Sequence, residues 1–267
     1  MTTTLHAKTA AYPDVTANFR KLASDYFEQV YFKFSPSVGT LDGLHQYDAL
    51  LEDYSRAGVE QQIAALKRFD ALVLSDYEKG LITDEFADRV LNACHRLKVP
   101  VFVAPQRSRL YAYRGAKAIV CNLKEAGQFV SRTLSDEKSV EEVGRALLAH
   151  FGVGAVLITQ GEKGMTLFEE SSPRHLNIPA TSFEVTYARV GQAGVDRGAT
   201  GRQVFDVTGA GDTVLSVLAL ASAAGASLPD AAMLANIAAG VVVGKLGTAS
   251  VSPAELQHGL DELRQEA

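Results

Sequence analysis

The stretch FDVTGAGDTVLSVLALASAAGA (residues 205–226) places two aspartates and two glycines directly before an apolar run. This order predicts a loop at residues 209–212 that opens a buried helix. Backbone amides at a helix start are free to bind an anion, and glycines let a phosphate come close to them. A carboxylate at that place would repel phosphate, so it needs a chemical reason to be there. Taking a proton from an attacking hydroxyl is such a reason. Asp212 beside these amides therefore predicts phosphoryl transfer to an alcohol.

The same four residues also have a purely structural interpretation. An Asp or Thr ahead of a helix is usually an N-cap, and Gly-x-Gly is usually a turn. Two other phosphate-binding motifs fit less well. The dinucleotide fingerprint needs a third small residue where Val214 stands, and the chain has no Gly-Lys-Ser or Gly-Lys-Thr of a P-loop.

Composition narrows the class of protein. The chain has 267 residues, of which 47% are hydrophobic, enough for a sizeable core in one large or two small domains. A formal charge of -5 gives no basic face for nucleic acid. The longest apolar stretch, residues 214–226, is shorter than the roughly 20 residues that span a bilayer. Cys94 and Cys121 lack metal-site or disulfide spacing. We expect a cytoplasmic protein with reduced thiols and neither a membrane nor a nucleic acid partner.

The character of the sequence changes near residue 69. Residues 1–69 hold 10 of the 21 Phe and Tyr residues but only 3 of the 22 glycines. Aromatic residues at helical spacing between Phe19 and Phe34 predict two or three amphipathic helices there. We therefore expect two units, a helical segment without a catalytic motif (1–69) and a larger unit (70–267).

From Asp70 onward the sequence predicts alternating strands and helices. Short β-rich runs occur at 71–75, 101–104, 118–121 and 155–159, and helical patterns at 83–98 and 139–151. Residues 164–170 read as an edge hairpin partner. Continuous apolar strands that need helical crossovers are typical of a parallel sheet with helices on both faces. The expected fold is therefore α/β, with three α-β-α layers.

Eight residues, DVTGAGDT (206–213), resemble the C-terminal signature of the ribokinase-like, or PfkB, carbohydrate kinases. Other segments are similar to the Asn-x-x-Glu element, the nucleotide-binding strand-turn-strand and the adenine-side helix of that family: CNLKEAG (121–127), ITQGEKGMTLF (158–168) and ANIAAGVVVGKLGTASVSP (235–253). With LVLSDYEKG (72–80) and YRGAKAIVCNLKE (113–125), the sequence is most similar to the kinase domain of bacterial heptose 7-phosphate kinases. The resemblance covers residues 70–267.

The resemblance implies roles for residues around the signature. Asp212 would be the base that deprotonates the acceptor hydroxyl, and the amides of the turn would neutralise the transferring phosphoryl group. The turn residues concerned are Gly209, Ala210 and Gly211, together with Asp212 itself. Asp206 and Thr208 resemble positions that bind a monovalent cation such as K⁺ in some members, although Asp206 could also brace the turn.

The resemblance also implies a site for ATP and Mg²⁺. Asn122 and Glu125 would lie near the ATP phosphates, where Glu125 would organise Mg²⁺ through water. The nucleotide site would be shaped by Thr159, Gly161 and Gly164, with Asn236 and Gly240 beside the adenine. Structural alternatives stay open: Asn122 and Glu125 could be an ordinary helix start, and the two turn glycines could be hairpin glycines.

The sequence departs from the family in three places. Ala104-Pro105-Gln106 stands where heptose kinases usually have Asp-Pro-Lys, which removes a carboxylate and a cation. Residues 183–201 form an apparent insertion. The first strands and the lid of the family have no counterpart, so we expect the sheet to lack both. Instead, residues 31–69 resemble the helical opening of an uncharacterised, metallopeptidase-related bacterial family, without a His-Glu-x-x-His motif.

Two functions follow as expectations. One is an ATP-dependent carbohydrate kinase whose acceptor is a sugar or sugar phosphate, heptose 7-phosphate above all. The other is a catalytically incomplete remnant that binds nucleotide or serves as an interaction module. In either case an apolar sheet face is left open, so we expect the aromatic helices of residues 14–69 to pack across it or two chains to meet there as a homodimer.

Overall fold

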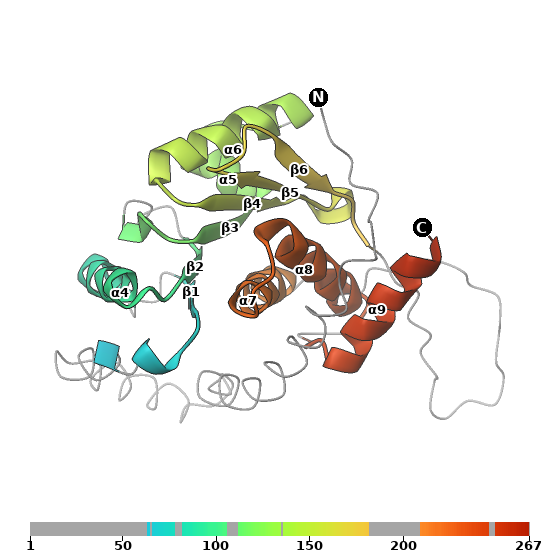
Figure 1. The fold of residues 1–267 in the computed structure, drawn as a ribbon. Helices are drawn as coiled ribbons and strands as arrows, with labels where there is room; N and C mark the ends of the chain where they lie inside the picture. The colour runs from blue at the N-terminus through green and yellow to red at the C-terminus, as the bar shows by residue number, and fades with distance from the viewer. Residues whose placement is uncertain are drawn as a thin grey trace, which may run out of the picture.

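The computed structural model describes residues 63–64, 66–77, 82–105, 112–134, 136–181, 209–245 and 249–266. Six strands and several helices follow one another along this part of the chain (Figure 1). The strands are β1 (Leu72–Ser75), β2 (Val101–Ala104), β3 (Ala118–Asn122), β4 (Ala155–Thr159), β5 (Met165–Glu169) and β6 (His175–Ile178). The α-helices are α4 (Asp84–Leu97), α5 (Leu123–Phe129), α6 (Glu137–Phe151), α7 (Ala210–Ala223), α8 (Leu228–Val243) and α9 (Pro253–Glu266), with short 3-10 turns η2 (Leu66–Arg68) and η4 (Gly161–Lys163).

The strands form one sheet in the order in which they occur in the chain. Strands β1 to β4 run parallel, whereas β5 and β6 are each antiparallel to the strand before. The expectation that residues 164–170 form the edge was wrong, because β5 lies between β4 and β6. The sequence HLNI of β6 is short, alternates polar and apolar residues and is half exposed except for Ile178, so it carries no apolar run by which a strand could be predicted.

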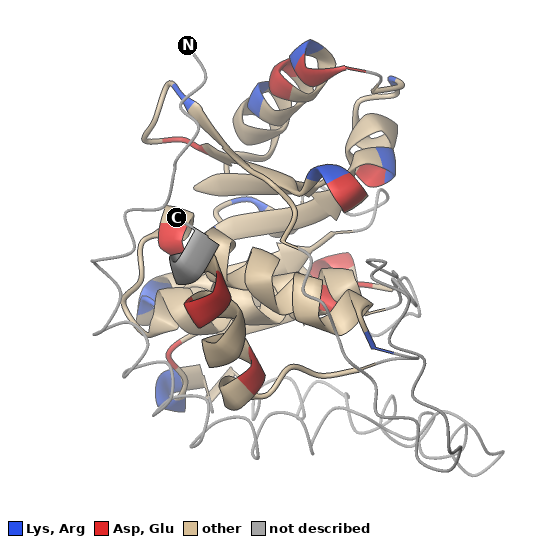
Figure 2. Cartoon of the chain, turned by 90° about the vertical axis from the view of Figure 1, so that its right-hand side faces the viewer, with Lys and Arg blue, Asp and Glu red and all other residues tan. Residues whose placement is uncertain are grey.

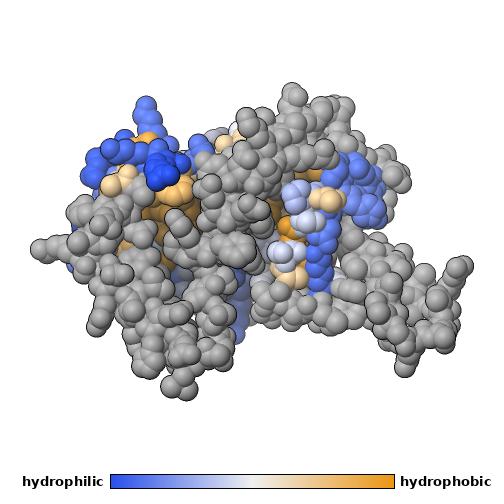
Figure 3. Space-filling model, turned by 90° about the horizontal axis from the view of Figure 1, so that it is seen from below, coloured by the Kyte–Doolittle hydropathy of each residue, from blue (hydrophilic) through white to orange (hydrophobic). Residues whose placement is uncertain are grey.

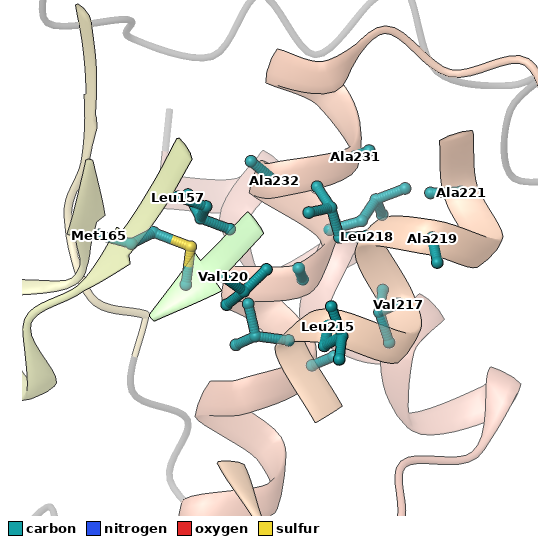
Figure 4. Close-up of a cluster of buried hydrophobic side chains, with 14 of the residues drawn as sticks. Val120, Leu157, Met165, Leu215, Val217, Leu218, Ala219, Ala221, Ala231 and Ala232 are labelled. Carbon is teal, nitrogen blue, oxygen red and sulfur yellow. The ribbon is translucent and has the colours of Figure 1, made fainter. Parts of the chain in front are cut away.

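Helices cover both faces of the sheet, which confirms the three-layer α/β fold. Alternate residues of each central strand enter different cores, because side chains on a strand point to opposite faces. Val120 of β3 and Leu157 of β4 pack against α7 and α8, while Ile119 and Ile158 pack against the layer of α4, α5 and α6. Figure 4 shows Val120, Leu157 and Met165 from the sheet beside Leu215 and Leu218 of α7.

Helices α7 and α8 are apolar almost all round, as expected for helices enclosed by other elements. Asp212 and Asp230 are the only charged residues in their sequences. In Figure 2, the charged residues, drawn in blue and red, accordingly lie mostly on the outer helices, including α6 and α9, and much less on α7 and α8. Alanines such as Ala219 and Ala231 are fully or almost fully buried, which lets the two helices approach closely.

Strand β1 has β2 as its one neighbour among the described residues. Val73 of β1 is 39% exposed, and Phe69 and Tyr77 at either end of the strand are also exposed. Seen from below, this side of the molecule shows hydrophobic as well as hydrophilic residues (Figure 3). Among the described strands, β1 is therefore an edge with an exposed apolar residue, and the open apolar sheet face stays a prediction.

Several expectations concern residues outside the described part. Of the helical segment 1–69, only residues 63–64 and 66–69 are described, and the first pair and η2 are helical. Whether residues 14–69 cover the sheet, or how the insertion 183–201 folds, stays a prediction. Cys94 and Cys121 are buried and not disulfide-bonded. Within the described ranges, no helix has both the length and the hydropathy needed to cross a bilayer.

A tight turn after β4 holds β5 and β6 in place. Gly161 and Gly164 both have positive φ, +61° and +86°. A Cβ at Gly161 would meet no other atom, whereas a Cβ at Gly164 would clash with the carbonyl oxygen of Ile178 and with the backbone that follows. A glycine is therefore required at position 164 for two reasons: its positive φ, and the close approach of the backbone at the end of β6.

Gly164→Ala should destabilise the protein much more than Gly161→Ala. Both substitutions put a side chain at positive φ, which costs about 1 kcal/mol. Only the first also forces the backbone of β6 to move, which should add about 2 kcal/mol or more. Urea denaturation of the two variants measures this difference. Equal losses of unfolding free energy would contradict the role assigned to Gly164.

Candidate active site

The parallel strands all end at the same edge of the sheet. Ser75 at the end of β1 is in register with Ala104 of β2, and Asn122 of β3 is in register with Thr159 of β4. In open α/β sheets, ligands bind outside the carboxyl ends of the strands. The predicted site residues of β3 and β4 thus lie along the edge where a ligand is expected.

The N-terminus of α7 meets this edge at β1. The hydroxyl of Ser75 donates a hydrogen bond to Oδ1 of Asp212 at 2.9 Å. The hydroxyl of Tyr77 donates another to Oδ2 of the same carboxylate. Both carboxylate oxygens of Asp212 therefore accept a proton-bearing hydroxyl group, which is the interaction that a base needs with an alcohol substrate.

The alternation of strand β1 explains why these hydroxyls face α7. Residues two apart on a strand share a face, so Ser75 and Tyr77 point to α7 while Asp76 points the other way. Asp76 is 4% exposed and accepts a hydrogen bond of 2.7 Å from the hydroxyl of Tyr113, which is 1% exposed. The amide of Asp76 also donates to the carbonyl of Ala104 at 3.1 Å. These buried contacts fix the end of β1 and so place Tyr77.

Tyr77 is a hydrogen-bond donor at neutral pH. Partial burial of its hydroxyl raises its pKa above 10.0, and the hydrogen bond to the Asp212 carboxylate together with its negative charge raises the pKa further. A phenol with a raised pKa keeps its proton, and this proton faces Oδ2 of Asp212.

The first turn of α7 presents open backbone amides. Gly209 is the N-cap, with φ +83°, and provides no side-chain cap. The first helical bond from this turn is Thr213 N to Gly209 O, so the amides of residues 210–212 have no acceptor within the helix. A Cβ at Gly211 would meet no other atom. The turn therefore has the open space and the donors that an approaching phosphate requires.

Asn122 and Glu125 form a capping box at the start of α5. The Asn122 side chain accepts from the Glu125 amide at 2.8 Å, and the Glu125 carboxylate accepts from the Asn122 amide at 2.9 Å. The structural alternative for this pair, a helix start, is therefore observed. Their position at the carboxyl end of β3 is compatible with the ATP role, which stays a prediction.

Asn236 and Gly240 hold the segment after β6 against α8. Asn236 is 4% exposed, and its amide nitrogen donates to the Pro179 carbonyl at 2.7 Å. The hydroxyl of Thr181 donates to the Asn236 carbonyl at 3.0 Å. A Cβ at Gly240 would clash with the Thr181 carbonyl oxygen. Both residues thus have a packing role, and their place beside an adenine stays a prediction.

Other predicted site features are tested less directly. Thr159 ends β4, next to the glycine turn described above. Asp206, Thr208 and Gln106 lie outside the described residues. Among the residues that the structure describes, no three His, Cys, Asp or Glu side chains lie together as a bare metal site would require. A single carboxylate such as Glu125 instead suits a hydrated Mg²⁺ that is also held by substrate phosphates.

A cavity of about 380 Å³ lies elsewhere, between α6 and strands β5 and β6. Its polar wall residues bond to one another: Gln160 donates to Thr166, Thr166 to Asn177, and Asn177 to Glu137. Neither Ser75, Tyr77 nor Asp212 lines this cavity. It is therefore separate from the Asp212 end of the candidate site, whereas Gln160 and Lys163 in its lining belong to the turn that also carries Gly161.

Sequence reasoning did not single out Ser75 and Tyr77. They are 137 and 135 residues away from Asp212 in the chain, so no local pattern joins them. The sequence pattern that could have indicated them is a pair of hydroxyl residues, two positions apart, at the end of an apolar strand. That spacing puts both on one face at the edge where ligands bind.

Similarity to known proteins is found over most of the chain. Residues 44–255 match the pfkB family carbohydrate kinases. The bifunctional protein HldE of Pseudomonas aeruginosa strain LESB58 is 42% identical over 202 residues, which are 76% of this chain and 37% of that protein. HldE of Yersinia enterocolitica is 42% identical over 196 residues, 73% of this chain and 36% of that protein. The chain spans little more than a third of these relatives.

Solved structures show the same fold. Arabidopsis thaliana ribokinase complexed with ribose and ATP has a TM-score of 0.59 at 19% identity, over 75% of this chain and 58% of that one. Escherichia coli phosphofructokinase-2 in complex with potassium has a TM-score of 0.60 at 16% identity, over 78% of this chain and 63% of that one. The sheet and its helices are thus ribokinase-like, and the match over residues 44–255 shows that the chain belongs to the pfkB family of carbohydrate kinases.

Proposed function

We propose that this chain transfers the γ-phosphoryl group of ATP to a hydroxyl of a sugar phosphate, with heptose 7-phosphate as the acceptor. The observation that carries the proposal is the Asp212 carboxylate, which accepts two hydroxyl hydrogen bonds one residue after the open amide of Gly211. The choice of acceptor rests on the similarity to HldE at 42% identity.

In the proposed reaction, Asp212 takes the proton of the acceptor hydroxyl. The freed oxygen forms a bond to the γ-phosphorus, and the bond from that phosphorus to the β-γ bridging oxygen breaks, which releases ADP. The amides of residues 210–212 would lie against the phosphoryl oxygens and stabilise their charge. Because α7 is packed between the sheet and α8, these donors need little reorganisation as the charge develops.

Mg²⁺ would neutralise phosphate charge when bound with ATP. Glu125 would orient its water ligands, while Asn122 would lie near the phosphates. Thr159, Gly161 and Gly164 would shape the nucleotide site, and Asn236 and Gly240 would back the adenine through the segment that they hold. K⁺ near Asp206 and Thr208 belongs to the same proposal, supported by the potassium complex of the E. coli relative in fold.

A second candidate is a catalytically incomplete kinase that binds nucleotide without turnover. One observation favours it: β1 has β2 as its one neighbour among the described residues. The deciding measurement is ADP production with and without heptose 7-phosphate, in Mg²⁺ and K⁺. Sugar-dependent ADP release supports the kinase, whereas calorimetric binding of Mg-ATP without any release supports the remnant.

Asp212→Asn should lower sugar-dependent ADP release by about 10²- to 10⁴-fold, because an amide cannot act as the base. The affinity for Mg-ATP, measured by calorimetry, should stay near that of the parent. Asp230→Asn is the matched control, since Asp230 is the third residue of α8 as Asp212 is of α7. Turnover that is equal in Asp212→Asn and the parent would remove Asp212 from the mechanism.

Gly211→Ala should separate stability from function. The new methyl group meets no protein atom, and alanine stabilises a helix by up to about 1 kcal/mol relative to glycine. The methyl group would, however, stand where the phosphoryl group approaches, so ADP release should fall about tenfold or more. The exposed Ser216→Ala, further along α7, is the control. A Gly211→Ala variant with full activity would show that no phosphate approaches this turn.

A further inference from the structure

We infer that Tyr77 occupies the place of the acceptor hydroxyl on Asp212 and is displaced when the sugar binds. The inference rests on the proposed function, because it assumes that an alcohol binds at Asp212. Its evidence is the arrangement of the two hydroxyls at the end of β1, which differ in how firmly the structure holds them.

Ser75 is a fixed partner of the carboxylate. It is the last residue of β1, it is half buried, and it is in register with Ala104 of β2. The residue after it, Asp76, is tied on the opposite side by Tyr113. Ser75 therefore holds Oδ1 of Asp212 without needing any movement of its own backbone.

Tyr77 is a removable partner. It lies two residues beyond the end of β1 and is 59% exposed, so its ring has little packing to hold it. Its restraints among the contacts of the described residues are therefore the hydrogen bond to Oδ2 of Asp212 and a side-chain hydrogen bond with Ser75. Rotation about its side-chain bonds would release Oδ2 and leave Ser75 on Oδ1.

The phenol and a sugar hydroxyl present the same group to the carboxylate. Each would donate one O–H to Oδ2 from the solvent-facing side of the site. The raised pKa of Tyr77 keeps the phenol protonated, so it holds the place as a neutral donor. Tyr77 thus keeps the carboxylate partnered until an acceptor hydroxyl takes over its hydrogen bond.

Such a competitor weakens the apparent affinity for the sugar. When only a fraction of the molecules has Oδ2 open, the apparent dissociation constant is the intrinsic constant divided by that fraction. If the phenol is bound in most molecules, its removal should strengthen sugar binding by about 3- to 10-fold. A permanent positioning role for Tyr77 predicts no such gain.

Tyr77→Phe tests the inference, with the parent and the control variant Ser171→Ala measured beside it. Calorimetry with heptose 7-phosphate alone gives the affinity, and steady-state ADP release gives KM and kcat. We expect Tyr77→Phe to bind heptose 7-phosphate about 3- to 10-fold more tightly, with a lower KM. Ser171→Ala removes an exposed hydroxyl near the opposite edge of the sheet, beyond the end of β5, so its affinity should match the parent.

A second measurement follows the phenol itself. The difference in phenolate absorbance between the parent and Tyr77→Phe reports the pKa of Tyr77. Contact with Asp212 raises that pKa, so saturating heptose 7-phosphate should lower it if the contact is lost. A pKa that does not change on sugar binding would overturn displacement.

The outcomes separate this inference from the proposed function. Tighter sugar binding by Tyr77→Phe without ADP release in any variant would retain the inference and reject the kinase. Unchanged or weaker binding, or a tenfold fall in kcat at constant KM, would show instead that Tyr77 positions the base. If neither the parent nor Tyr77→Phe binds heptose 7-phosphate, the inference that the sugar displaces Tyr77 is overturned as well.

Discussion

The packing of α7 against the parallel strands is the interaction on which the candidate site depends. Leu215 and Leu218 of this helix are buried in the core that also contains Phe102 and Val120 of the sheet. Since the helix is anchored along its length, its first turn has one position relative to the end of β1. The carboxylate of Asp212 and the amides beside it are therefore held where the strands end, although the helix start itself has no side-chain cap.

Much of the fold follows from local sequence, because a buried parallel strand is a continuous apolar run that the chain itself displays. Strands β1 to β4 and helices α4 and α6 were predictable in this way. Strand β6 was not, because its half-exposed sequence becomes a strand only through pairing with β5. Asp212 was predictable from the signature around it, whereas Ser75 and Tyr77 reach it only through the three-dimensional fold.

Residues carried over from a family signature can have two roles at once. The capping box of Asn122 and Glu125 and the bonds of Asn236 to Pro179 would be present in a protein with no ligand at all. Sequence alone cannot separate these structural roles from binding, because the same side-chain atoms serve both. Gly211 differs from Gly164 and Gly240 in this respect, since space beside it is open and no packing contact accounts for a glycine there.

The alternation at the end of β1 limits which changes this segment can accept. Deleting one residue before Ser75 would exchange the two faces of the strand end. The carboxylate of Asp76 would then turn toward that of Asp212, and like charges at that distance repel, while Tyr77 would be driven toward the space beside Tyr113. Substitutions along β1 change one contact at a time, but a length change alters every contact together. Among descendants of this sequence, insertions and deletions should therefore be confined to the loops that flank the strand.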